Sequence, residues 1–180
     1  MKKLTTLVLA AAIVLAGVFF SLQTADARAK GVSIMEFDTM VGVPKAYTGV
    51  SNPIRGISGG GLPWVIRAAE GELKQSGDLE VSVTGLVLDP NDPDVIARGL
   101  AGQNPSPNFR AIVSCQSLDA SGNANVVNLF TGLFPATTGP ASSGGGKAKI
   151  ETHVDLPKPC IAPIIFVTSP ANAWFAATGN

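Results

Sequence analysis

Ser58 is the residue whose surroundings come closest to a catalytic motif. Gly56-Ile57-Ser58-Gly59-Gly60 matches the G-x-S-x-G turn that presents the nucleophile of many serine hydrolases. That turn needs a buried strand before the serine and a helix after it. Asn52-Pro53 precedes the motif instead, and Pro63 follows its glycine run, so neither element is expected. We assign no catalytic residue, and a hydrolase that uses Ser58 stays only as an alternative.

His153 is the only histidine, so a multi-histidine metal site and a second imidazole base are excluded. It shares the polar face of an alternating strand with Glu151 and Asp155. That pattern is typical of a solvated outer surface. The sequence therefore predicts no metal ligand set and no cofactor.

Glu70, Glu72 and Glu80 are expected on the outer face of one predicted hairpin, with Glu72 opposite Glu80. Like charges directly opposite each other cost stability unless a cation or water relieves them. A bound divalent ion is the alternative there, because carboxylates are hard-cation ligands. A second oxygen-rich stretch, residues 89–94, lacks the glycine and distal glutamate of a calcium loop. Turn formation and helix capping explain that stretch better.

Four residues in or beside long irregular segments are candidates for ligand binding: Tyr47, Arg55, Trp64 and Arg98. An aromatic ring beside a guanidinium can form a small hot spot for a polymer, a peptide or a sugar. Each of the four side chains could equally pack its own loop. We take them as the predicted binding residues for an unknown extracellular ligand or protein.

Cys115 and Cys160 are the only cysteines. Their wide spacing, with no C-x-x-C motif, argues against a redox or metal-binding thiol pair. In an oxidising compartment they are expected to form one disulfide. Closing a loop of that length stabilises a fold by about 4 kcal/mol in the chain-entropy description.

The clearest structural pattern is a pair of alternating arms, residues 69–74 and 79–84. Each arm alternates apolar or small residues with polar ones, the period of a half-buried strand. A three-residue loop, Gln75-Ser76-Gly77, sets Leu73 opposite Leu79, and Gly77 supplies the left-handed residue that such loops need. The sequence therefore predicts a β-hairpin.

The rest of the chain reads as strands joined by long loops and tight turns. Asp92 followed by Pro93 predicts one short helical turn. If successive strands are antiparallel, the long loops at residues 42–63, 89–107 and 135–146 all emerge at one end, where they could share a binding surface. The glycine-rich composition of the last loop indicates flexibility. The other predicted strands cover residues 32–41, 109–118, 124–134, 147–156, 160–168 and 174–178.

Residues 1–27 have the features of a signal peptide: Lys2 and Lys3, then an apolar run too short to cross a bilayer, then small residues at 25 and 27. Residues 28–180 are long enough for one domain. The chain has 13 basic and 13 acidic side chains without clustering, so no nucleic acid partner is predicted. Membrane contact is predicted only through the cleaved signal peptide, and the mature domain is expected to be extracellular or periplasmic.

Several segments of the chain, NPIRGISGGGLPW, FRAIVSC, TGLFPATT and PCIAPIIFVTSP, resemble a group of small, exported, uncharacterised bacterial β proteins. The resemblance spans nearly all of residues 28–180, but it implies no activity and no catalytic residues. GELKQSGDLEVSVTGL is also faintly similar to hairpins of the chordin-type CHRD domain. The histidine-bearing motif common in that domain is missing, which leaves the second resemblance without functional residues.

The sequence thus predicts an all-β domain, an antiparallel β-sandwich or closed barrel of about eight strands with one disulfide. Its expected function is that of a secreted, non-catalytic binding or structural module that uses the long-loop face. A small outer-membrane β-barrel is the alternative, because it too has long loops on one side and tight turns on the other. The chain lacks the aromatic girdles of such barrels, having a single tyrosine.

Overall fold

The structure is a computed structural model that describes residues 31–179. The predicted signal peptide lies outside the described residues, as do residues 28–30 of the predicted domain. None of the helices in the described part of the chain is long and apolar enough to cross a membrane. The elements are β1 (Ser33–Phe37), β2 (Val41–Gly42), η1 (Lys45–Tyr47), β3 (Trp64–Val65), β4 (Ala68–Lys74), β5 (Asp78–Thr84), β6 (Val87–Leu88), α1 (Pro93–Ala97), β7 (Gln103–Asn104), β8 (Asn108–Leu118), β9 (Ala124–Phe130), β10 (Phe134–Pro135), β11 (Gly139–Pro140), η2 (Ala141–Ser143), β12 (Ala148–His153), β13 (Ile161–Thr168) and β14 (Trp174–Ala177).

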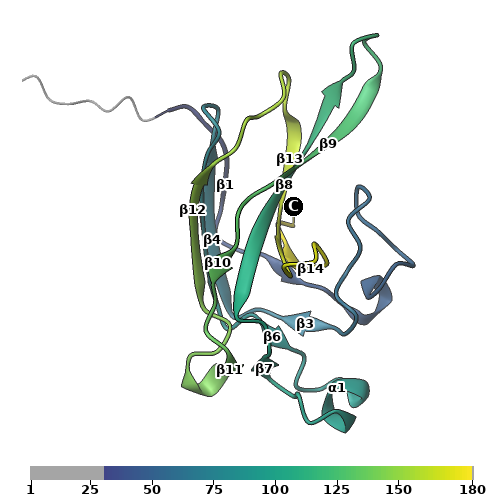
Figure 1. The fold of residues 1–180 in the computed structure, drawn as a ribbon, viewed down its shortest axis with the longest axis vertical. Coiled ribbons are helices and arrows are strands. Elements are labelled where there is room, and N and C mark those ends of the chain that lie inside the picture. Colours follow the sequence, from purple (N-terminus) through teal and green to yellow (C-terminus); the bar gives the residue numbers. More distant parts are fainter. Residues whose placement is uncertain (1–30, 180) are drawn as a thin grey trace, which may run out of the picture.

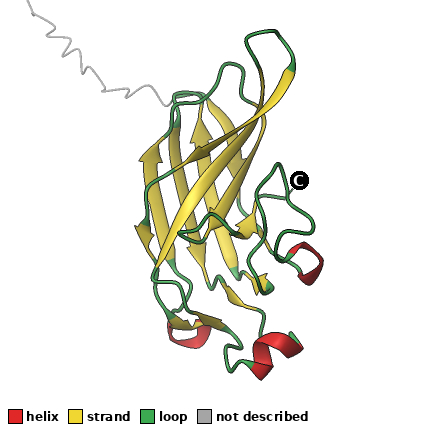
Figure 2. Cartoon of the chain, turned by 45° about the vertical axis from the view of Figure 1, so that its right-hand side comes forward, coloured by secondary structure: helices red, strands yellow, loops and turns green. Residues whose placement is uncertain are grey.

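The longer strands form two antiparallel sheets that pack on each other (Figure 1). The first sheet has the order β1-β4-β5-β12, and the second has the order β10-β8-β13-β14-β2, with β9 also paired to β8. Both sheets are open at their edges, which Figure 2 shows from a second direction. The predicted all-β, antiparallel class is confirmed, and of its two architectures the β-sandwich is the one that the described residues form.

The predicted hairpin is confirmed in both its arms and its register. β4 and β5 pair with Leu73 opposite Leu79 and Glu72 opposite Glu80. Gly77 closes the loop with φ +101°, and a Cβ there would lie 2.0 Å from the carbonyl oxygen of Val154. Only glycine fits that position, because the turn requires a positive φ and the backbone of a distant segment approaches closely.

One hydrophobic core lies between the sheets, and its largest contributions come from β5, β8, β13 and β14. The inner side of β8 is buried at Phe109, Ala111, Val113 and Cys115, as its alternation predicts. Ile112 on the opposite side is also fully buried, because residues 42–63 cover the outer side of the second sheet there. β8 is therefore a central strand covered on both faces.

The disulfide between Cys115 and Cys160 is formed, with an S–S distance of 2.05 Å and a Cα–Cα distance of 5.0 Å. It ties β8 to the residue that precedes β13. The prediction of one disulfide is confirmed.

The three long loops contact one another at one end of the sandwich, as predicted. Lys45 in residues 42–63 pairs with Asp92 and Asp94, and the carbonyl oxygen of Pro63 accepts from the amide of Asp89 at 2.9 Å. β7 pairs with β11, which joins residues 89–107 to residues 135–146 at the lower end of Figure 1. The loop of residues 135–146 is expected to be flexible from its composition, but it contains the short strand β11 and the 3-10 helix η2. The amide of Asn104 donates to the carbonyl oxygen of Thr137 at 2.9 Å. Tertiary pairing gives this glycine-rich loop the order that its composition does not indicate.

The prediction of one strand over residues 32–41 is wrong. β1 pairs with β4 in the first sheet, whereas β2 pairs with β14 in the second. The chain therefore crosses between the two sheets within this segment. Its imperfect alternation reflects that crossing, because each half has a different buried side.

Candidate functional site

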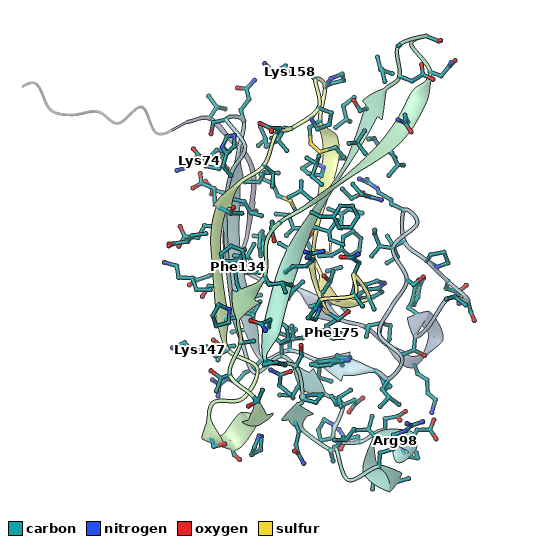
Figure 3. All side chains as sticks on the ribbon, viewed as in Figure 1. Lys74, Arg98, Phe134, Lys147, Lys158 and Phe175 are labelled. Atoms are coloured by element: carbon teal, nitrogen blue, oxygen red, sulfur yellow. A yellow bond between two sulfur atoms is a disulfide. The ribbon has the colours of Figure 1, made fainter. Side chains whose placement is uncertain are left out.

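The structure does not bring the four predicted binding residues together, and Trp64 is the one farthest from a binding role. Its side chain is only 4% exposed and lies in the hydrophobic core. The indole stacks on Phe175 at a centroid distance of 3.8 Å and meets Phe109 edge-on at 6.5 Å. Figure 3 labels Phe175 inside the fold. Trp64 is thus a core residue that directly follows the loop of residues 42–63.

Arg55 holds the loop of residues 42–63 against the second sheet. Its guanidinium donates to the carbonyl oxygens of Ser114 at 2.7 Å and Ala162 at 2.8 Å. The backbone carbonyl oxygen of Arg55 accepts from the side-chain amide of Asn128 at 3.0 Å. Desolvation lowers the pKa of Arg55 from its ordinary value, but the group stays charged at neutral pH. Arg55 therefore holds the tip of the loop against the second sheet. The start of the same loop contacts residues 89–107, because Lys45 forms ion pairs with Asp92 at 3.0 Å and Asp94 at 2.8 Å.

We expect Arg55→Asn to lower the free energy of unfolding by about 2 kcal/mol, because two charge-assisted hydrogen bonds are lost, one of them to the carbonyl oxygen of the buried Ser114. Asparagine is chosen because Arg55 has φ 49° and asparagine tolerates that backbone. Arg98→Asn, at an exposed residue after α1, is the matched control and should change little. Urea unfolding measures both variants. Equal midpoints for the two would contradict the role of Arg55.

Tyr47 and Arg98 are exposed, but they lie on different elements. Tyr47 is 41% exposed, at the end of η1, with its ring edge-on to Trp174 at 6.3 Å. With Trp174 and Ile54 it lines a shallow apolar hollow of about 200 Å³. Arg98 caps the carboxyl end of α1. The long-loop face as a binding surface stays a prediction.

Ser58 does not lie in a nucleophile turn. Arg55 and Gly56 form the two-residue turn between Ile54 and Ile57, both with positive φ, and the carbonyl of Ser58 accepts from the amide of Trp174 at 2.9 Å. The serine thus continues as an extended segment beside β14 instead of entering a helix. A strand-turn-helix around the serine is the geometry that a hydrolase would require.

A row of four glutamates crosses the outer side of the first sheet. Glu36 lies opposite Glu72, Glu72 opposite Glu80, and Glu80 opposite Glu151, so each of the four strands contributes one carboxylate. We call this set the glutamate row. Sequence reasoning found the central pair, but it missed both ends, because the pairing of β1 and β12 with the hairpin is long-range. The alternation around Glu151 was the only local signal.

An open hollow of about 630 Å³ lies over Glu36, Glu72 and Glu80 of the glutamate row. We call it the acidic groove. No lysine or arginine lines it. The period-two alternation of β4 and β5 places the carboxylates outward while Leu73 and Val81 point into the core. The lining residues are Glu36, Phe37, Asp38, Glu70, Gly71, Glu72, Glu80 and Ser82.

Two lysines neutralise part of the glutamate row from its rim. The ammonium of Lys149 contacts Glu151 and lies 3.1 Å from Glu80, and these two carboxylates raise its pKa above the ordinary value. Lys74 lies 3.7 Å from Glu72, and Figure 3 shows it at one end of the first sheet with Lys147 at the other. Among the described residues, no basic side chain forms an ion pair with Glu36 or Glu70.

His153 extends the charged surface beyond the glutamate row. Its Nδ1 lies 3.1 Å from Asp78, and this hydrogen bond is the main reason why the pKa of Asp78 is below its ordinary value. Both side chains are more than half exposed. The hydroxyl of Ser76 donates to the other carboxylate oxygen of Asp78 at 2.9 Å, so the carboxylate lies between the serine and the histidine, whereas Ser58 lies beside β14 in the other sheet.

The carboxylates of the glutamate row are spread across the four strands of the first sheet. Within residues 31–179, no three histidine, cysteine, aspartate or glutamate side chains are arranged to hold a metal ion. The carboxylates lie side by side across strands instead of converging on one point. Strands in a sheet are about 4.8 Å apart, so the glutamate row extends over about 14 Å.

The chain matches no family model, no curated protein and no solved structure. The resemblances to small exported bacterial proteins and to CHRD hairpins therefore stay predictions.

Proposed function

We propose that the protein is an exported, non-catalytic binding module whose acidic groove holds a cationic partner. The observation that carries the proposal is the glutamate row, in which four carboxylates lie directly opposite one another on adjacent strands. Like charges in that arrangement lower the stability of the sheet. Lys74 and Lys149 offset part of this repulsion, but among the described residues no basic side chain pairs with Glu36 or Glu70. A sequence that keeps an unfavourable local arrangement on an open surface is best explained by what the surface binds.

The shape of the glutamate row favours an extended partner over a single ion. A compact cation contacts two or three converging oxygens, whereas these carboxylates are spread over about 14 Å. A segment with several lysine or arginine side chains could pair with them one after another. We therefore infer that the partner is a basic stretch of another polypeptide.

Export is supported by two features of the chain. Lys2, Lys3 and the apolar run that follows them are typical of a secretory signal. The Cys115–Cys160 disulfide suits an oxidising compartment such as the periplasm or the cell exterior. Both features support a location in which the acidic groove would meet other exported proteins.

The direct experiment is to titrate the purified, disulfide-bonded protein with hexalysine and to measure the heat of binding by calorimetry, at low and at high salt. We expect binding that weakens as salt increases, because exposed charges are screened. Hexaglutamate is the matched control ligand and should not bind. Absence of hexalysine binding at low salt would overturn the proposed function.

Glu72→Gln locates the binding on the acidic groove. Removing one carboxylate from the centre of the glutamate row should weaken hexalysine binding about two- to fivefold, the worth of one exposed ion pair. Asp94→Asn removes the same charge from α1, outside the acidic groove, and should leave affinity unchanged. The melting temperature of Glu72→Gln should equal or exceed that of the unmodified protein, because a repulsion is removed. Equal losses in both variants would show non-specific attraction.

A further inference from the structure

β9 is the longest edge strand in the described part of the chain, and it pairs only with β8. Its seven residues, ANVVNLF, contain no charge, no proline and no glycine. In an antiparallel pair, alternate backbone N–H and C=O groups of an edge strand point away from its neighbour. β9 thus offers a row of backbone donors and acceptors to a further strand.

The other edges of the sandwich have the features that prevent strand addition. β1 contains Glu36, and β12 contains Lys149 and Glu151, and charged side chains are a common protection of sheet edges. β2 has only two residues. β9 has neither protection, and no residue from Ala120 to Gly146 is ionisable.

Apolar side chains are exposed around the same edge. Val126 is 41% exposed and Phe130 49% exposed, and both lie on the outer side of the second sheet, because they pair with Gln116 and Ile112. Leu118 and Leu133 nearby are also about half exposed. Figure 1 shows the β8–β9 hairpin projecting beyond the body of the sandwich, where its edge is accessible. Apolar groups beside unpaired backbone are typical of an interface.

We propose that β9 pairs antiparallel with β9 of a second copy of this chain, so that the second sheet continues across a two-fold dimer. With Asn128 on the two-fold axis, Val126 lies opposite Phe130 of the second copy, and Val127 lies opposite Leu129 of the second copy. β-branched residues opposite aromatic or aliphatic residues are favourable cross-strand pairs. The strand is therefore complementary to itself on both faces, and no like charges meet.

This interface is separate from the acidic groove. β9 belongs to the second sheet, whereas the glutamate row lies on the outer side of the first sheet. Each copy in the dimer would keep its own acidic groove, so a basic partner with two suitable segments could bind both. Dimer formation and hexalysine binding can be measured independently, and either can fail without the other.

The test is analytical ultracentrifugation of the disulfide-bonded protein over a range of concentrations. We expect a reversible dimer. Val126→Lys should weaken dimerisation about tenfold or more, because it places an ammonium group opposite Phe130 of the second copy. Val50→Lys is the matched control: Val50 is 81% exposed in the loop of residues 42–63, and its substitution should leave the dimer unchanged. If Val126→Lys does not fold, Asn125→Lys at another exposed position of β9 replaces it as the test variant, and it should likewise weaken the dimer.

The register has its own test. In Val126→Lys/Phe130→Glu, each new ammonium would lie opposite a new carboxylate of the second copy, so dimerisation should recover relative to Val126→Lys alone. A dimer as weak as that of the single variant would overturn the register centred on Asn128. A monomer at all concentrations for the unmodified protein, or an unchanged dimer in Val126→Lys, would overturn the proposal as a whole.

Discussion

Replacing Trp64 with alanine is expected to lower the free energy of unfolding by about 3–5 kcal/mol. The indole is 4% exposed and stacked at 3.8 Å on Phe175, so its removal leaves a cavity lined by aromatic rings that cannot close over it. For a domain of this size the melting temperature should fall by about 6–20 °C. Thermal unfolding followed by circular dichroism measures the change.

Trp64→Phe separates loss of packing from loss of the indole itself. Phenylalanine can keep the stacking on Phe175, so this variant should recover most of the lost stability. Tyr47→Ala, at an aromatic ring that is 41% exposed, should cost much less than Trp64→Ala. A Trp64→Ala protein that melts at the temperature of the unmodified protein would contradict the core role of this residue.

Removing the disulfide with the double substitution Cys115→Ala/Cys160→Ala should cost about 4 kcal/mol. The bond spans 45 residues, so its loss gives the unfolded chain much more conformational freedom. Cys115 is also fully buried beside the core, which adds a small packing loss. Urea unfolding of the double variant and of the reduced protein should show the same lowered midpoint.

Comparing the reduced protein with the double variant separates two effects, because reduction removes the bond but keeps both sulfur atoms in the packing. A reduced protein that unfolds at the midpoint of the oxidised one would contradict the predicted contribution of the bond. A large difference between the reduced protein and the double variant would show that packing of Cys115, and not chain closure, makes the main contribution.

Elements with local determinants were predicted well. The β4–β5 hairpin follows from alternation on both arms and from a glycine that the turn requires. The short helix α1 follows from Asp92, whose carboxylate accepts from the amides of Asp94 and Val95, and from Pro93 at the first helical position. In both cases the causes lie within a few residues, where sequence patterns are informative.

The candidate site was only half predictable for the opposite reason. Glu72 and Glu80 are neighbours through a tight turn, and their pairing was expected. Glu36 and Glu151 join them through strands that are distant in sequence, and nothing local indicates which residues of those strands lie opposite. The glutamate row exists only after the first sheet is assembled.

Trp64 and Arg55 illustrate a second limit of sequence patterns. A tryptophan and an arginine beside long loops fit a binding surface by residue type, and the sequence does not show burial. The structure places the indole against Phe175 and directs the guanidinium to two carbonyl oxygens of its own chain. Contacts between segments that are distant in sequence decided these roles.

For this protein, sequence alone determined the class of fold, the hairpin at its centre, the capped helical turn and the disulfide partners, because period, turn chemistry and cysteine count are local or countable properties. Only the tertiary structure decided which strands are neighbours. That choice brought four carboxylates into one row, left β9 as an uncharged edge, and buried Trp64, because strand order and register depend on the packing of the whole core.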